Sequence, residues 1–124
     1  MVVEDESMLL QAINKKLTAL GIEVISCVSG KQAVDYLDAL TEVPDAIWLD
    51  YFLKDMNGLE FMSEMKKHKG WENVPVLVVS NSASPDKVSH MIALGAKRYV
   101  IKAEHRLDEI VEIIKKLVED TNNE

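Results

Sequence analysis

The sequence predicts a single α/β domain in which helices cover both faces of a parallel five-stranded sheet. Five short apolar or β-branched patches, typical of buried strands, recur along the 124 residues at 2–3, 22–26, 46–49, 74–79 and 99–101. A longer segment with helical periodicity follows each patch. This (βα)5 repeat favours right-handed crossovers and a three-layer, doubly wound fold.

Capping residues mark where several of these helices begin and end. Side chains that accept backbone hydrogen bonds stand at three expected helix starts, namely Ser29, Asn57 and Ser84. Pro85 then occupies the first helical position of the fourth helix. Glycine, which tolerates left-handed backbone, stands at three expected helix ends, namely Gly21, Gly70 and Gly95.

The last segment predicts an amphipathic helix that closes the fold. Its apolar residues lie on one stripe at helical spacing: Leu107, Ile110, Val111, Ile114, Leu117 and Val118. We expect the folded domain to span residues 1–119 and residues 120–124 to form a frayed polar tail.

Composition excludes several classes of protein. A hydrophobic content of 48% in 124 residues suits one compact domain. The single cysteine, Cys27, cannot form an internal disulfide, and no apolar run approaches the roughly 20 residues of a membrane span, so we expect a cytoplasmic protein without membrane insertion. A net charge of -7 argues against direct nucleic-acid binding.

Polar residues follow the expected strands at their carboxyl ends, where parallel sheets bind ligands. Glu4 and Asp5 follow the first strand, Asp50 the third, Ser80 the fourth and Lys102 the fifth. Clustered carboxylates resist ionisation unless a cation neutralises them, and oxygen ligands suit Mg²⁺. These residues therefore predict a magnesium site at one edge of the sheet.

Five segments together resemble the receiver domains of response regulators in two-component signalling, such as chemotaxis regulators. They are the acidic opening 2–6, the segment 47–50, Gly58 eight residues after it, the hydroxyl-ending segment 76–80 and the lysine-ending segment 99–102. The resemblance spans essentially the whole chain. It implies a flavodoxin-like strand order, 2-1-3-4-5, and a signalling phosphoacceptor that catalyses only its own phosphorylation and dephosphorylation.

The resemblance assigns Asp50 as the nucleophile that becomes phosphorylated. It also assigns Mg²⁺ to Glu4, Asp5, Asp50 and the backbone carbonyl of Phe52. Taken alone, Asp50 is more typical of a helix cap or loop acid, and the surrounding constellation is what favours the phosphoacceptor. The alternative for Glu4 and Asp5 is a solvated acidic pair near a helix N-terminus.

The remaining family roles fall on the last two strands. Lys102 would pair with a phosphoryl oxygen and Ser80 would donate a hydrogen bond to another. Ser80 and Tyr99 would act as switch residues that carry the change to a helix over residues 85–94 and to the surface of the last two βα units. The alternatives are a solvated lysine, a turn-capping serine and a tyrosine that only fills the sheet surface.

The chain departs from the family pattern near the site. Lys54 and Ala103 stand where receivers commonly have proline, so the Lys102–Ala103 peptide is open to either isomer. Asn81 replaces a small residue, and Phe52 lies two residues beyond Asp50. We expect Phe52, Lys54 and Asn81 to tune access to Asp50, and Phe52 to slow self-dephosphorylation.

The family resemblance implies a sensor histidine kinase or a histidine phosphotransfer protein as the phosphodonor, an output partner of unknown identity and a monomer or weak homodimer. Two alternatives remain. One is a degenerate receiver that binds partners without phosphorylation. The other is an aspartate-based phosphohydrolase, which would need an Asp-x-Asp pair, whereas Phe52 stands two residues after Asp50.

Overall fold

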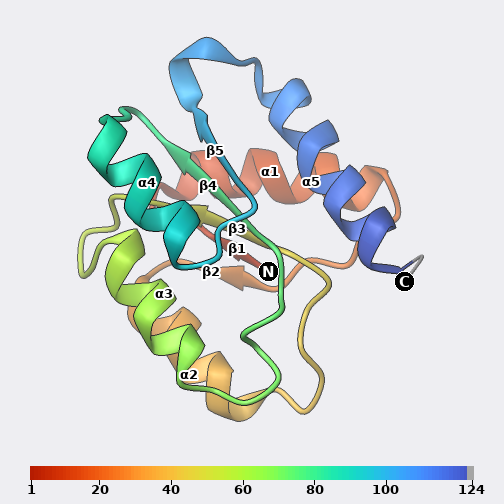
Figure 1. The fold of residues 1–124 in the computed structure, drawn as a ribbon. Coiled ribbons are helices and arrows are strands. Elements are labelled where there is room, and N and C mark those ends of the chain that lie inside the picture. Colours follow the sequence, from red (N-terminus) through yellow and green to blue (C-terminus); the bar gives the residue numbers. More distant parts are fainter. Residues whose placement is uncertain (123–124) are drawn as a thin grey trace.

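A computed structural model describes residues 1–122 and contains one parallel sheet with the order β2-β1-β3-β4-β5 (Figure 1). The strands are β1 (Val2–Val3), β2 (Ser26–Cys27), β3 (Ile47–Asp50), β4 (Val76–Ser80) and β5 (Arg98–Ile101). Every neighbouring pair is parallel. The predicted fold class and strand order are confirmed.

Five helices cover the two faces of the sheet (Figure 1). They are α1 (Ser7–Ala19), α2 (Gly30–Ala39), α3 (Gly58–Lys66), α4 (Pro85–Ala93) and α5 (Leu107–Asn122), and a short 3-10 helix, η1 (Lys102–Glu104), follows β5. Buried residues of α1 and α5 form one core, whereas those of α2, α3 and α4 form the other. The three-layer arrangement follows from these two cores.

Strand β3 shows how the sequence divides side chains between the two cores. Ile47 and Leu49 lie in the core under α2, α3 and α4, whereas Trp48 lies in the core under α1 and α5. Successive strand residues point to opposite faces, so a continuous apolar run is required where both faces are covered. The chain therefore reaches Asp50 at the end of a strand that is buried on both sides.

Strand β2 is shorter than the sequence pattern predicts. We expected a strand over 22–26, but only Ser26 and Cys27 pair, opposite Val2 and Val3. The reason is that β2 is an edge strand whose one neighbour, β1, has only two residues. Strand β1 has the predicted bounds, whereas β3, β4 and β5 differ from theirs by one or two residues, and β4 includes Ser80.

The predicted helix starts are confirmed. The side chains of Ser29, Asn57 and Ser84 accept the backbone N–H groups three residues ahead, at 3.1, 2.9 and 3.2 Å. Gly21 and Gly95 directly follow the capping residues of α1 and α4, with φ angles of 79° and 104°. Gly70 has a φ of 93° but lies in the turns beyond α3, which ends earlier, at Lys66.

Helix α5 extends past the predicted domain boundary at residue 119. It includes residues 120–122, which we expected in the polar tail, and residues 123–124 lie outside the described residues. The Thr121 hydroxyl lies within hydrogen-bond distance of the carbonyls of Leu117 and Asp45, at 2.9 and 3.1 Å, and can donate its one proton to either, which ties the last turn to the domain. Within residues 1–122, no helix is long and apolar enough to cross a membrane.

Candidate metal-binding site

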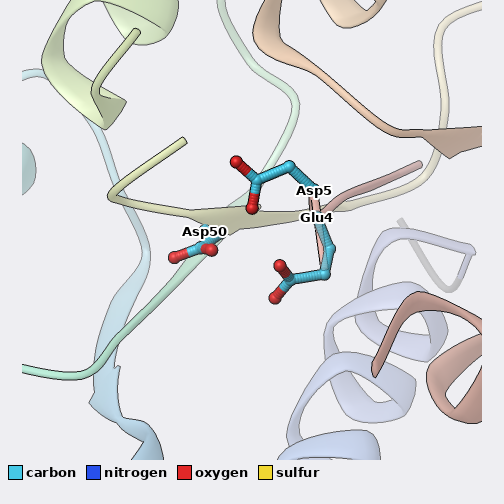
Figure 2. A group of neighbouring side chains, drawn as sticks. All are labelled: Glu4, Asp5 and Asp50. Atoms are coloured by element: carbon cyan, nitrogen blue, oxygen red, sulfur yellow. The ribbon is translucent and has the colours of Figure 1, made fainter. Parts of the chain in front are cut away.

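The carboxyl ends of β1 and β3 bring three acidic side chains together (Figure 2). Glu4, Asp5 and Asp50 each offer a carboxylate oxygen, and the three oxygens lie within 4.8 Å of one another. Glu4 and Asp50 are buried, with 0% and 6% of their surface exposed, and Asp5 is partly exposed. Burial of Glu4 contradicts the alternative of a fully solvated acidic pair.

The surroundings of Asp50 disfavour its charged form. Burial, together with the nearby carboxylate of Glu4, raises the pKa of its carboxyl to about 7. Lys102 and a 3.4 Å hydrogen bond from the Phe52 N–H act in the opposite direction. Asp50 therefore needs additional positive charge to be fully ionised at neutral pH.

Lys102 supplies one positive charge to the site. Its Nζ lies 3.0 Å from Oε1 of Glu4 and 3.5 Å from Oδ2 of Asp50. Burial lowers the pKa of the ammonium, but the two carboxylates outweigh that effect and the pKa is raised. The amine is consequently charged, and its hydrogen bond goes to Glu4.

The donor set fits a hard divalent cation. The cluster contains three carboxylates and one ammonium, which pairs with Glu4 and Asp50, so it keeps excess negative charge when all four groups are ionised. Mg²⁺ prefers oxygen ligands, keeps several waters and is usually held by one or two carboxylates together with phosphate oxygens. Glu4, Asp5 and Asp50 are the residues that would hold it.

Hydrogen bonds from the backbone orient two of these carboxylates. Asp5 Oδ2 accepts the N–H of Lys54 at 2.7 Å, and Glu4 Oε2 accepts the N–H of Glu6 at 3.0 Å. Such partners fix the direction of the ligand atoms before a cation arrives. The loop that carries Lys54 thus helps to position the carboxylate of Asp5.

Ser80 reaches the same edge at the end of β4. It lies opposite Ile101, the residue before Lys102, and its side chain is fully buried. Its Oγ accepts the N–H of Ser82 at 3.3 Å. The structure therefore brings Ser80 beside the strand end that carries Lys102, whereas Asn81 is exposed just beyond it.

Tyr99 is tied to the loop after β4. Its hydroxyl donates a 2.8 Å hydrogen bond to the carbonyl of Ser82, and its ring lies 6.3 Å from the ring of Tyr51. The Tyr99 hydroxyl therefore has a hydrogen-bond partner in the protein. The alternative, a tyrosine that only fills the sheet surface with its hydroxyl in water, includes no such partner. The Lys102–Ala103 peptide is trans, because the part of the chain that the structure describes contains no cis bond.

Phe52 lies at the rim of the site with 48% of its surface exposed. Its ring packs edge-on against Tyr51 at 4.7 Å, and the Nζ of Lys87 lies 4.4 Å from its ring centre. Sequence reasoning missed both neighbours. No sequence pattern marks Tyr51, which directly follows β3, or Lys87, which is one of several lysines on helices. Only the position of α4 beside the loop after β3 identifies them.

Comparison with known proteins places the chain among signalling proteins. The sequence pattern of the family described as "Response regulator receiver domain" matches residues 1–115. The transcriptional regulatory protein KdpE of Mycobacterium tuberculosis is 36% identical over 103 residues, which cover 82% of this chain and 43% of KdpE. The chain thus spans less than half the length of that relative.

Two further proteins match over most of both chains. The chemotaxis protein CheY homolog of Campylobacter jejuni is 28% identical over 82% of this chain and 78% of its own. The receiver domain of the sensor histidine kinase PA1611 of Pseudomonas aeruginosa superimposes with a TM-score of 0.79 and 23% identity over 94% of this chain and 93% of that one. That structure has a magnesium ion coordinated in its active-site cleft.

Proposed function

This chain belongs to the response regulator receiver domain family, and from that premise we propose that Asp50 accepts a phosphoryl group from a partner's phosphohistidine, with Mg²⁺ as cofactor. One observation carries the proposal: Glu4, Asp5 and Asp50 converge with Lys102 at the carboxyl edge of the sheet. A sensor histidine kinase or a histidine phosphotransfer protein is the proposed donor. The magnesium ion reported for the PA1611 receiver domain supports the choice of cofactor.

The transfer requires an ionised Asp50. One carboxylate oxygen attacks the phosphorus, the phosphorus–nitrogen bond breaks, and the donor imidazole leaves with the electron pair and takes up a proton. Bound Mg²⁺ would neutralise the phosphoryl oxygens and lower the pKa of Asp50. Lys102, held next to Asp50 at 3.5 Å, supplies a further positive charge beside the reacting oxygen.

After transfer, the new charge can reorganise Lys102 and Ser80. A phosphoryl group adds about -1.5 to -2 charges, and a charge-assisted hydrogen bond contributes about 1.5 to 3 kcal/mol. Inverting a two-state population from 1:99 to 99:1 needs about 5.5 kcal/mol. We therefore propose that Ser80 and Lys102 act together, and that Tyr99 shifts with the loop to which its hydroxyl is bonded.

Phosphorylation can be tested by incubating the protein with acetyl phosphate and Mg²⁺ and measuring its intact mass. We expect the natural protein to gain the mass of one phosphoryl group and Asp50→Asn to gain none. Asp45→Asn is the matched control, because Asp45 is an exposed acid that precedes the opposite end of β3. It should be phosphorylated like the natural protein.

Two outcomes would contradict the proposal. An unchanged mass of the natural protein would favour the degenerate receiver, which binds partners without phosphorylation. A mass gain that persists in Asp50→Asn would place the acceptor on another residue.

A further inference from the structure

The loop between β3 and α3 forms a closed turn over the site. Phe52 and Asn57 pair across the loop as an isolated antiparallel β-bridge, and the N–H of Leu53 donates to the carbonyl of Met56 at 3.1 Å. Lys54 and Asp55 consequently stand at the tip. The tip is held on two sides by contacts with elements that are distant in sequence.

The first contact binds the tip to the cation site. The backbone N–H of Lys54 donates to Oδ2 of Asp5 at 2.7 Å. Proline lacks an N–H, so a proline at position 54 could not make this bond. The Lys54 N–H thus provides a hydrogen bond that orients one of the three carboxylates.

The second contact binds the tip to the start of α2. Asp55 accepts two backbone N–H groups, from Gly30 to Oδ1 at 3.0 Å and from Lys31 to Oδ2 at 2.8 Å. Ser29 caps the same helix independently by accepting the N–H of Gln32. Because its two oxygens face N–H groups, Asp55 holds the loop and is not itself a metal ligand.

Close packing reinforces this second contact. A Cβ on Gly30 would lie 2.3 Å from Cγ of Met56, so the absence of a side chain at Gly30 leaves room for the loop. The first turn of α2 therefore receives both the carboxylate of Asp55 and the side chain of Met56. These contacts connect α2 to the backbone that carries Phe52 and Lys54.

We propose that Asp55 is a positioning residue for divalent-cation binding. By anchoring the loop tip on α2, it keeps the Lys54 N–H directed at Asp5 and keeps the backbone of Phe52 beside Asp50. The inference rests on the proposed function, because it assumes that Glu4, Asp5 and Asp50 bind the cation. Asp55 does not itself bind to Glu4, Asp5 or Asp50. Its contacts instead connect cation binding to the start of α2.

The test is a titration of the natural protein, Asp55→Ala and Ser29→Ala with MgCl2, followed by amide NMR shifts of residues near Asp50. Removing a residue that orients metal ligands weakens metal affinity on the order of 10-fold or more. We therefore expect Asp55→Ala to bind Mg²⁺ on the order of 10-fold more weakly than the natural protein. Ser29→Ala is the matched control, since it weakens the same helix start without releasing the loop. It should bind Mg²⁺ as the natural protein does.

A second readout follows the Lys54 amide proton directly. Its exchange with solvent should become faster in Asp55→Ala than in Ser29→Ala, even where the two variants have equal melting temperatures. Asp55→Asn serves if Asp55→Ala does not fold. It keeps one acceptor oxygen and should show an intermediate loss of affinity.

Equal Mg²⁺ affinity of Asp55→Ala and the natural protein would overturn the role of Asp55 while leaving the proposed function intact. An equal loss in Ser29→Ala would also overturn it, because a general weakening of α2 would then explain the effect. If the natural protein shows no Mg²⁺-dependent shifts, the proposed function fails at its cofactor and this inference fails with it.

Discussion

At the scale of single residues, the central feature is a carboxyl group held where its ionisation is costly. Asp50 is buried next to Glu4, and Lys102 only partly compensates for the two acids. An uncompensated buried charge destabilises the folded state, but the same charge is available to a cation or a phosphoryl group. Burial of Asp50 thus lowers the stability of the folded protein and keeps a carboxylate available for reaction.

The first prediction concerns the pH dependence of this cost. The pKa of Asp50 rises from its ordinary value of 3.8 to about 7 on folding, so its ionisation opposes folding increasingly between these pH values and by a constant amount above them. Without Mg²⁺, Asp50→Asn should be more stable than the natural protein by about 1 to 3 kcal/mol above pH 7, and the difference should shrink towards pH 4. Urea unfolding across this range measures it.

If Asp50→Asn raises the free energy of unfolding by the same amount at every pH, this prediction is contradicted. Glu112→Gln provides the control, because Glu112 is an exposed acid on α5 and should show a small difference at every pH.

The second prediction concerns Phe52, whose ring is supported by Tyr51 and Lys87 at the rim of the site. If the ring limits the approach of water to a phosphorylated Asp50, Phe52→Asn should speed hydrolysis several-fold, because the smaller amide can also hydrogen-bond an incoming water. Phe52→Leu keeps an apolar side chain and should change the rate less. Phosphate release from the phosphorylated protein measures both rates, and equal rates for Phe52→Asn and the natural protein would refute the shielding role.

At the scale of secondary-structure elements, α4 is joined to the site through aromatic packing. The ring of Tyr51 lies between Phe52 and Tyr99, and Lys87 of α4 lies over Tyr51 and Phe52, at 5.6 and 4.4 Å. Tyr99 in turn holds the loop before α4 through the carbonyl of Ser82. A change at the end of β3 or β4 therefore has direct contacts through which it can reach α4.

The third prediction tests the fit between α3 and α4. A Cβ on Gly58 would lie 3.0 Å from the ring of Tyr51 and 3.1 Å from Cε of Met91, closer than ordinary contacts. Gly58→Ala should destabilise the protein by about 1 to 3 kcal/mol through overpacking, although alanine favours a helix. Ser63→Ala on the exposed face of α3 is the control and should stay within about 0.5 kcal/mol of the natural protein in chemical unfolding. A Gly58→Ala variant as stable as this control would show that Met91 yields freely.

At the scale of the whole molecule, the parallel sheet assembles the site. The order β2-β1-β3-β4-β5 places β1 and β4 on the two sides of β3, with β5 beyond β4. Residues as distant in sequence as Glu4 and Lys102 therefore meet at one edge. Binding at that edge connects several strands, so it should stabilise the fold as a unit.

The fourth prediction follows from this linkage. A ligand that binds only the folded protein at 100 times its dissociation constant adds about 2.7 kcal/mol, which corresponds to several degrees in melting temperature for a domain of this size. Adding MgCl2 should raise the melting temperature of the natural protein more than that of Asp50→Asn, at matched ionic strength in KCl. An equal rise in both would indicate general screening of the net charge of -7.

Much of the architecture was predictable from local patterns. The fivefold alternation of apolar patches and helical segments predicted the fold class, and the caps at Ser29, Asn57 and Ser84 are confirmed because each acts within three residues. The family resemblance predicted the strand order and is itself confirmed. The roles proposed for Asp50, Ser80, Lys102 and Tyr99 remain predictions.

Local patterns are enough to predict which residues stand at the strand ends, because strand and helix periods act over a few neighbouring positions. The contacts between distant segments follow only from the folded arrangement: Lys102 on Glu4, Lys54 on Asp5, Asp55 on the start of α2, and Lys87 over Phe52. These contacts join positions up to 98 residues apart, and no local period encodes them. These contacts depend on how the helices and loops pack on the sheet, and that packing exists only in the folded chain.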